Sequence, residues 1–385
     1  MIKKHYPLSA CLLVFLFFLP QMMVGEEIFD VPEILKDNVM FWKKIYTEVS
    51  LTEGVIHDNE YPMIIYRLIS LANRTGKTRK GYLQENMAAV ERILETMNNK
   101  SPDQWTGIEC QIRDLFKQYA NLDALKDAAS RLRFQLGQKE RFKEGLERAA
   151  AYMPFIMATF EKMNIPKRVA YLPHVESSFN IEARSRVGAA GMWQFMRGTG
   201  KLFHLKMDSK IDERHDPIRS TLAAAQLLIK NYENLKSWPL AITAYNHGPA
   251  SIKRAVLETG SRNLGVIIEK YKNRRFKFAS KNFYGCFIAA SEIASQPEKY
   301  FSNLNLHPQL KFNEIQIRNS LAPQKLAKQL GVSQDNLKKL NPALRPVLFK
   351  RQLPIPTPYV LRIPTSRATE KAAFSAADSG ADKDN

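Results

Sequence analysis

Cysteine is scarce in this chain of 385 residues, which contains only 3 of them. Cys11 lies in an apolar N-terminal run, so only Cys110 and Cys286 would remain after removal of a leader. Two cysteines in separate segments exclude the disulfide framework on which many small secreted domains depend. A single bridge stays open, although we expect two buried free thiols, because unpaired cysteine is among the most buried residue types.

The sequence also lacks histidines at the spacing of metal ligands, and it lacks long apolar runs. The 7 histidines show no pattern such as His-Glu-x-x-His, so we expect no metal site. The apolar run from Leu8 to Leu19 is shorter than the roughly 20 residues that a membrane-spanning helix needs. Because Lys3 and Lys4 precede this run and Gly25 follows it, residues 1–25 predict a secretory signal peptide. An uncleaved anchor, and with it an association with the membrane, also stays open.

Acidic residues are few compared with basic ones. The 57 Lys and Arg residues against 38 Asp and Glu give a formal net charge of +19, which indicates a polyanionic partner. Nucleic acid is disfavoured, since the basic residues are scattered and no nucleic-acid-binding module shows its usual spacing of aromatic residues and glycines. Peptidoglycan and anionic lipid remain equally good partners. The apolar fraction of 45% is that of a globular protein.

The apolar periodicity divides the chain into segments. Residues 26–150 predict a helical N-terminal region, which a long helix around residues 142–160 joins to the next segment. Residues 151–300 predict a succession of short helices with almost no strand signal. Residues 311–365 predict a small module with strands at both ends. Residues 366–385 are rich in Ala, Ser, Asp and Lys and predict a disordered tail.

The module at residues 311–365 has a recognisable order of elements. The predicted elements are a strand (Phe312–Ile317), two short helices (Leu321–Leu330 and Ser333–Leu340) and a closing strand (Tyr359–Pro364). With Gly331-Val332 between the helices and Ile363-Pro364 at the end, this order resembles a LysM glycan-binding module. Asn319-Ser320-Leu321 stands where that family has a Gly-Asp-Thr loop. The module is therefore LysM-like, and retention of glycan binding stays open.

Glu176 stands in the most informative stretch of the chain. Pro173 should bend the last turn of the preceding helix, which places a carboxylate at a helix end that faces a cleft. Val175 and Phe179 are apolar neighbours that would raise the pKa of Glu176 by desolvation. Glycosidic bond cleavage needs such an acid, still protonated near neutral pH.

Three sequence blocks in this order carry a resemblance. They are PHVESSFN (173–180), GAAGMWQF (188–195) and AYNHG (244–248). They resemble the SLT domain of the lytic transglycosylases, a goose-lysozyme-like family that cleaves peptidoglycan glycan strands, and within it the membrane-bound murein transglycosylase D type. The resemblance implies a mainly α, lysozyme-like catalytic domain over residues 151–300. It also implies a periplasmic enzyme without a cofactor.

The resemblance further implies the chemistry and the residue roles. Glu176 would first donate a proton and then accept one from the C6 hydroxyl of N-acetylmuramic acid, which closes a 1,6-anhydro ring without consuming water. The implied substrate-binding residues are Ser177 and Ser185 as hydroxyls that orient Glu176 or contact the substrate, Met192 and Gln194 in the cleft, Tyr245 and Asn246 at the sugar and its N-acetyl group, and Tyr284 as a cleft tyrosine. Many relatives have this tyrosine directly after an asparagine, where this chain has Phe283.

Three alternatives remain. A lysozyme-type hydrolase on the same fold would need a second carboxylate, for which Asp212, Glu213 and Asp216 are candidates. However, Asp216 before Pro217 predicts a helix cap, and we expect the other two in a solvated loop. A silent wall-binding protein would have no need of an acid. A DNA-binding protein is suggested only by the charge. Endo or exo cleavage, strand preference and oligomeric state are not determined by the sequence.

Overall fold

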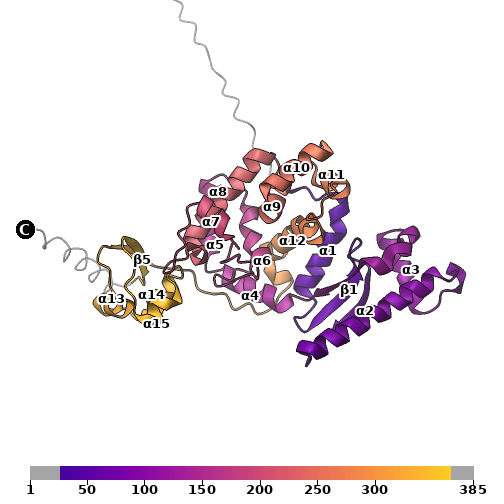
Figure 1. Cartoon of the computed structure of the whole chain (residues 1–385), viewed down its shortest axis with the longest axis horizontal. Coiled ribbons are helices and arrows are strands. Elements are labelled where there is room, and N and C mark those ends of the chain that lie inside the picture. The colour runs from indigo at the N-terminus through magenta and orange to yellow at the C-terminus, as the bar shows by residue number, and fades with distance from the viewer. Residues whose placement is uncertain (1–26, 366–385) are drawn as a thin grey trace, which may run out of the picture.

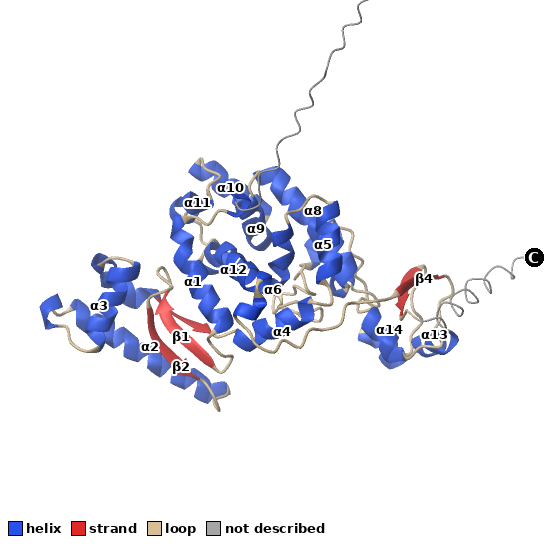
Figure 2. Ribbon diagram, turned by 180° about the vertical axis from the view of Figure 1, so that it is seen from behind, coloured by secondary structure: helices blue, strands red, loops and turns tan. Residues whose placement is uncertain are grey.

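The computed structural model describes residues 27–365, which form three bodies, each around its own cluster of buried apolar residues. A large helical body lies between a smaller domain that contains a sheet and a C-terminal module (Figures 1 and 2). The mainly helical class predicted from the sequence is confirmed. The predicted signal peptide (1–25) and tail (366–385) lie outside the described residues.

The helical body is organised around α12 (Phe278–Ser295), most of whose residues are buried and against which α1 (Glu33–Thr47) packs. Its other helices are α4 (Lys139–Ala149), α5 (Met153–Lys162), α6 (Leu172–Glu176), α7 (Arg197–Leu202), α8 (Pro217–Leu235), α9 (Trp238–His247), α10 (Pro249–Thr259) and α11 (Leu264–Lys270), with 3-10 turns at Glu27–Phe29, Lys167–Tyr171, Glu213–His215 and Pro297–Lys299.

Prolines and polar caps set where these helices begin. Proline stands in the first turn of α5, α6, α8, α9 and α10, where its missing N–H would have no partner within the helix in any case. The Asp216 carboxylate accepts hydrogen bonds from the backbone N–H groups of Ile218 and Arg219, both at 2.9 Å. The predicted cap of α8 is therefore confirmed. The predicted continuous helix over 142–160 is wrong, because α4 ends at Ala149 and α5 begins anew before Pro154.

The smaller domain, residues 48–137, is inserted between α1 and α4 and is here called the sheet domain. Its strands are β1 (Glu53–Asp58), β2 (Ile65–Ser70) and β3 (Leu132–Leu136), in the antiparallel order β2-β1-β3. It also contains α2 (Gly76–Asn98), α3 (Ile108–Tyr119) and 3-10 turns at Pro102–Gln104 and Leu122–Arg131. Figure 2 shows α2 running beside the sheet. Val90 and Leu94 of α2 and Phe116 of α3 fill its core.

The sheet corrects the prediction of a helical region over residues 26–150. The central strand β1 has five of its six residues buried, so its sequence lacks the alternation of polar and apolar residues that marks a half-exposed strand. Its partner β3 follows only after α2 and α3. Strands that pair over such a distance leave no local pattern in the sequence. The structure also assigns α1 to the core of the helical body.

The C-terminal module follows the predicted order, with one additional helix. β4 (Asn313–Ile317) and β5 (Tyr359–Ile363) pair antiparallel, and between them lie α13 (Pro323–Gln329), α14 (Gln334–Leu340) and α15 (Pro346–Arg351). Ile211 of the helical body joins the apolar cluster of this module. The linker before it runs along α4, where the backbone N–H of His307 donates to the carbonyl oxygen of Glu147. The module is thus packed on the helical body and not merely tethered to it.

Two further predictions concern the thiols and the membrane. Both thiols are free, as expected, but only Cys286 is buried, because Cys110 is partly exposed. Over residues 27–365, no helix combines enough length with enough apolar character to cross a bilayer.

Candidate active site

Glu176 is the last residue of α6, as predicted. This short helix follows a 3-10 turn, and Pro173 in its first turn lets it start again on a new axis. The backbone N–H groups of Ser177 and Phe179 both donate to the carbonyl oxygen of Pro173, at 3.0 and 3.2 Å, which closes the helix end. The carboxylate therefore stands where the chain leaves the helix.

The chain turns sharply after Glu176 through two residues with left-handed backbone conformation, Ser178 (φ 52°) and Phe179 (φ 58°). Such a conformation is uncommon for residues other than glycine, and it persists only where the surroundings enforce it. Phe179 is fully buried, and the guanidinium of Arg148 donates two hydrogen bonds to the carbonyl oxygen of Ser178, at 3.0 and 2.8 Å. A Cβ at Gly145 would lie 2.9 Å from that of Ser178, so α4 approaches this turn closely only because it has glycine there.

Glu176 as a whole residue is partly exposed, but burial of its carboxyl group raises the pKa of that group to about 8. Among the described residues it has no hydrogen-bond or ion-pair partner within bonding distance. A carboxyl group in such surroundings stays protonated at neutral pH, because the apolar environment disfavours the charged form. It can therefore donate a proton to a bound molecule.

This pKa makes the stability of the protein depend on pH. Between the ordinary value of 4.5 and about 8, the unfolded chain has released the Glu176 proton and the folded chain has not. Stability therefore falls as pH rises through this window. We expect Glu176→Gln to gain about 2 to 4 kcal/mol in free energy of unfolding relative to the parent between pH 4.5 and 8, with no further gain above that.

Urea denaturation at several pH values measures this difference. The matched control is Glu182→Gln, which changes an exposed glutamate six residues further along. Its difference from the parent should stay constant with pH. A constant difference for Glu176→Gln as well would show that the carboxyl group is not protonated in the folded protein at neutral pH.

The turn over residues 188–195 lies beside Glu176 and is held by hydrogen bonds from the residues on either side of it. The Ser177 hydroxyl donates to the carbonyl oxygen of Met192 at 2.8 Å, and the Tyr245 hydroxyl donates to that of Trp193, also at 2.8 Å. Burial raises the pKa of Tyr245, and the negative charge of a nearby Glu176 adds to this effect. The structure therefore brings Glu176, Ser177 and Tyr245 together. The two hydroxyl groups hold the turn, and they do not contact the Glu176 carboxyl group.

The other predicted substrate-binding residues differ in their contacts and in their exposure. Gln194 donates from Nε2 to the carbonyl oxygen of Gly191 at 2.7 Å, and the Ser185 hydroxyl accepts from the N–H of Ala189 at 2.9 Å. Both side chains thus stabilise the turn. Met192 is buried, with an exposed fraction of 1%. Asn246, at the end of α9, is exposed, and its amide group is available to a ligand.

Tyr284 does not join this group. It is fully buried in α12, and its hydroxyl donates to the carbonyl oxygen of Asp30 at 3.2 Å, near the start of the described chain. It therefore has no surface to offer a substrate. The expectation from the resemblance is corrected here, and the neighbouring Phe283 is buried as well, with an exposed fraction of 5%.

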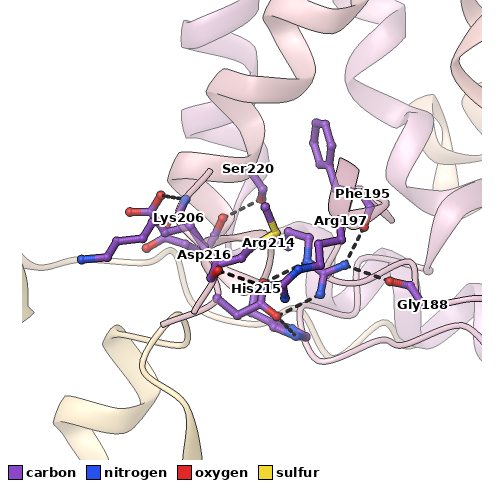
Figure 3. Close-up of polar contacts among 12 residues, drawn as sticks. Gly188, Phe195, Arg197, Lys206, Arg214, His215, Asp216 and Ser220 are labelled. Atoms are coloured by element: carbon purple, nitrogen blue, oxygen red, sulfur yellow. Dashed lines mark hydrogen bonds and ion pairs between the residues drawn. The ribbon is translucent and has the colours of Figure 1, made fainter. Parts of the chain in front are cut away.

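Arg214, which forms a buried ion pair, also holds the two ends of the turn at Gly188 and Phe195 (Figure 3). Arg214 donates from Nε and Nη2 to both oxygens of Asp212, at 2.9 and 3.0 Å. Its Nη1 donates to the carbonyl oxygens of Gly188 and Phe195, at 2.8 and 3.1 Å, which are the two ends of the turn. A Cβ at Gly191 would lie 1.7 Å from the carbonyl oxygen of Arg214, so the turn also packs directly on this segment.

Asp212 was expected in a solvated loop, and this is wrong. Only 1% of its surface is exposed. Burial alone would raise its pKa, but the hydrogen bonds and charge of Arg214 hold the pKa below its ordinary value. The sequence signal that could have indicated this role is the close spacing of Asp212, Arg214 and Asp216, since such alternating charges can pair with one another.

The C-terminal module binds to the same two aspartates. Arg345 donates to Asp212 at 3.1 Å, and the buried Arg362 donates to Asp216 at 2.7 Å. The backbone adds hydrogen bonds from the N–H of Asp212 to the carbonyl oxygen of Ala343 and from that of Arg345 to the carbonyl oxygen of Lys210. The module is therefore connected to the turn beside Glu176 through Asp212 and Arg214.

The chain is similar to several known proteins. The family model for the transglycosylase SLT domain matches residues 153–267. The chain is 28% identical over 202 residues to membrane-bound lytic murein transglycosylase D of Escherichia coli (strain K12), covering 51% of this chain and 44% of that protein. It is 36% identical over 112 residues to a putative tributyltin chloride resistance protein of Alteromonas sp. (strain M-1), covering 28% of this chain and 53% of that protein. The chain thus spans about half the length of these relatives.

Solved structures give more distant likenesses. A lytic transglycosylase Slt from Pseudomonas aeruginosa, solved as an inactive mutant, is 17% identical with a TM-score of 0.33, over 57% of this chain and 31% of that one. The 70 kDa soluble lytic transglycosylase of Escherichia coli is 17% identical with a TM-score of 0.31, over 62% of this chain and 34% of that one. The family match spans Glu176, the turn beside it and Tyr245. Residues 153–267 therefore form a transglycosylase SLT domain.

Proposed function

We propose that this protein is a lytic transglycosylase that cleaves the β-1,4 bond between N-acetylmuramic acid and N-acetylglucosamine in peptidoglycan and leaves 1,6-anhydro ends. The observation that carries the proposal is the Glu176 carboxyl group. This group belongs to a residue that is partly exposed, it has no protein partner within bonding distance among the described residues, and burial raises its pKa to about 8. An acid in this state is ready to protonate a leaving oxygen.

In the proposed reaction Glu176 acts twice. Its proton goes to the glycosidic oxygen as the bond from C1 to that oxygen breaks, which leaves a carboxylate. The carboxylate then takes the proton of the C6 hydroxyl while O6 bonds to C1, so the acid is regenerated and water is not consumed. Ser177 and Tyr245 would keep the turn over residues 188–195 in place, and Asn246 would bind the N-acetyl group.

The surroundings of the other carboxylates favour this reaction over hydrolysis. A hydrolase of the usual kind needs a second carboxylate that can activate water or attack the sugar. Asp212 is held by Arg214 and Arg345, and Asp216 caps α8 and binds Arg362. Glu213 accepts a hydrogen bond from the N–H of Lys206 at 2.7 Å. Each candidate named from the sequence thus has a structural role.

Mass spectrometry of the products tests the proposal. Purified peptidoglycan digested by the protein should yield muropeptides with anhydro ends. Reducing ends, one water heavier, would instead indicate a lysozyme-type hydrolase. The absence of products, together with tight sedimentation on the wall, would indicate a protein that only binds.

We also propose that residues 311–365 bind glycan as a LysM-like module. The order of β4, α13, α14 and β5 supports this, and the altered loop at residues 319–321 does not disturb the paired strands. Hydrogen exchange of the full chain carrying Glu176→Gln should show protection within residues 311–365 when N-acetylglucosamine oligomers are added. Protection confined to the helical body would contradict this proposal.

The place of action follows from the same proposal. The substrate lies in the periplasm, and the name of the Escherichia coli relative describes a membrane-bound protein. We propose a periplasmic protein, exported by residues 1–25 and associated with the membrane. Cell fractionation would test this, because recovery in the cytoplasm would contradict it.

A further inference from the structure

A basic segment connects α11 to α12. Residues 270–281 contain no aspartate or glutamate, and they include Lys270, Lys272, Arg274, Arg275, Lys277 and Lys281. All of these cations except the partly exposed Lys281 are exposed. Over residues 27–365, none of the six lies in an ion pair within 4.0 Å. The segment therefore presents positive charge that no carboxylate pairs with directly.

The segment is held in place beside the candidate active site. Tyr271 and Phe276 are buried, with exposed fractions of 2% each. The ring of His247 lies 5.1 Å from that of Phe276, and its Nδ1 is hydrogen-bonded to the Ser280 hydroxyl at 2.8 Å. His247 ends the helix that carries Tyr245 and Asn246. In addition, α12 packs against both α6 and α9. The cations thus lie near the groups that surround Glu176.

The positive charges affect one another. Burial lowers the pKa of Lys281, and the charge of Lys272 lowers it further, with only a partial offset from Glu60. Across the boundary with the sheet domain, the Arg133 guanidinium lies 4.0 Å from the centre of the Phe278 ring, and its Nε has no hydrogen-bond partner among the described residues. The basic surface therefore extends from the segment to β3, and it would attract an anionic ligand.

We propose that the basic segment binds the carboxylate groups of the peptides that are attached to the glycan strands of the substrate. This inference rests on the proposed function, because a strand in the cleft would bring its peptides to the rim formed by this segment. Anionic lipid fits less well. The ring of Phe276 is buried and that of Phe278 is covered by Arg133, so the segment has no exposed aromatic side chain to enter a bilayer.

Binding measurements without turnover test this proposal. The full chain carrying Glu176→Gln would be compared with the same chain carrying Lys272→Gln, Arg274→Gln and Arg275→Gln in addition. The ligands are soluble glycan strands with their peptides and the same strands after an amidase has removed the peptides. We expect the dissociation constant for peptide-bearing strands to rise about 5- to 30-fold at low salt, since each exposed charge pair contributes modestly, and that for bare strands to stay unchanged.

The matched control removes three other exposed cations, Lys77, Lys80 and Arg92 on α2, by the same change to glutamine. Its affinity for either ligand should equal that of the parent. Equal losses on both kinds of strand, or no loss on either, would overturn the proposal. So would a loss seen only with vesicles containing phosphatidylglycerol. Because binding is measured without cleavage, failure to find anhydro products would count against the proposed function and not against this result.

Discussion

Glu176→Gln is expected to lower the rate of strand cleavage by about 10³- to 10⁴-fold, the largest effect of any single substitution in this protein. Glutamine has nearly the same shape as protonated glutamic acid, but it can neither give up a proton to the leaving oxygen nor receive one from the C6 hydroxyl. Both steps of the proposed reaction therefore lose their proton carrier. The release of new strand ends from purified peptidoglycan, followed by mass spectrometry, measures the rate.

The affinity of Glu176→Gln for glycan strands shows whether the lower cleavage rate comes from lost catalysis or from lost folding. Because the carboxyl group is neutral at pH 7 according to its pKa of about 8, the neutral amide should leave strand binding nearly unchanged. Glu182→Gln, an exposed change of the same kind, should keep the full rate. If Glu176→Gln retained a tenth of the parent rate while binding strands normally, Glu176 would not be the acid and the proposed mechanism would have to be abandoned.

The parts of the fold that could be predicted from the sequence depend on short-range contacts. The start of α8 is an example, since Asp216 and Pro217 determine it together through a cap and a fixed φ angle. The order of elements in the C-terminal module is another, since each strand and helix has its own period. The sheet domain could not be predicted in this way, because β1 is buried and pairs with strands on both sides, one of them distant in sequence.

The candidate site shows the same division. Glu176 could be placed at a helix end because Pro173 precedes it directly, and its raised pKa follows from apolar neighbours. The role of Arg214 could not be foreseen, because it donates to the carbonyl oxygens of Gly188 and Phe195, which lie 26 and 19 residues earlier in the chain. Tyr284 was misassigned because its burial depends on contacts distant in sequence, among them the hydrogen bond to the carbonyl oxygen of Asp30.

Arg214→Met is expected to destabilise the protein by about 3 to 5 kcal/mol, the largest loss of stability that we predict. The substitution leaves the Asp212 carboxylate buried, with Arg345 at 3.1 Å as its remaining hydrogen-bonded cation. It also removes both hydrogen bonds to the carbonyl oxygens at the two ends of the turn. Urea denaturation at pH 7 measures the change in free energy of unfolding. The control, Arg184→Met, alters an exposed arginine 3.9 Å from Asp212 and should cost less than about 1 kcal/mol.

A second variant separates the two effects of Arg214→Met, which are the buried carboxylate that it leaves and the hydrogen bonds to the turn that it removes. Asp212→Asn combined with Arg214→Met removes the buried carboxylate that has lost its bidentate partner, so the double variant should be more stable than Arg214→Met alone. Its cleavage rate should nevertheless stay low, because the turn that carries Met192 and Trp193 still lacks the donor that held both of its ends. If Arg214→Met had the stability of Arg184→Met, the ion pair would not be what fixes the turn. The hydrogen bonds from Ser177 and Tyr245 would then have to hold it beside Glu176 unaided.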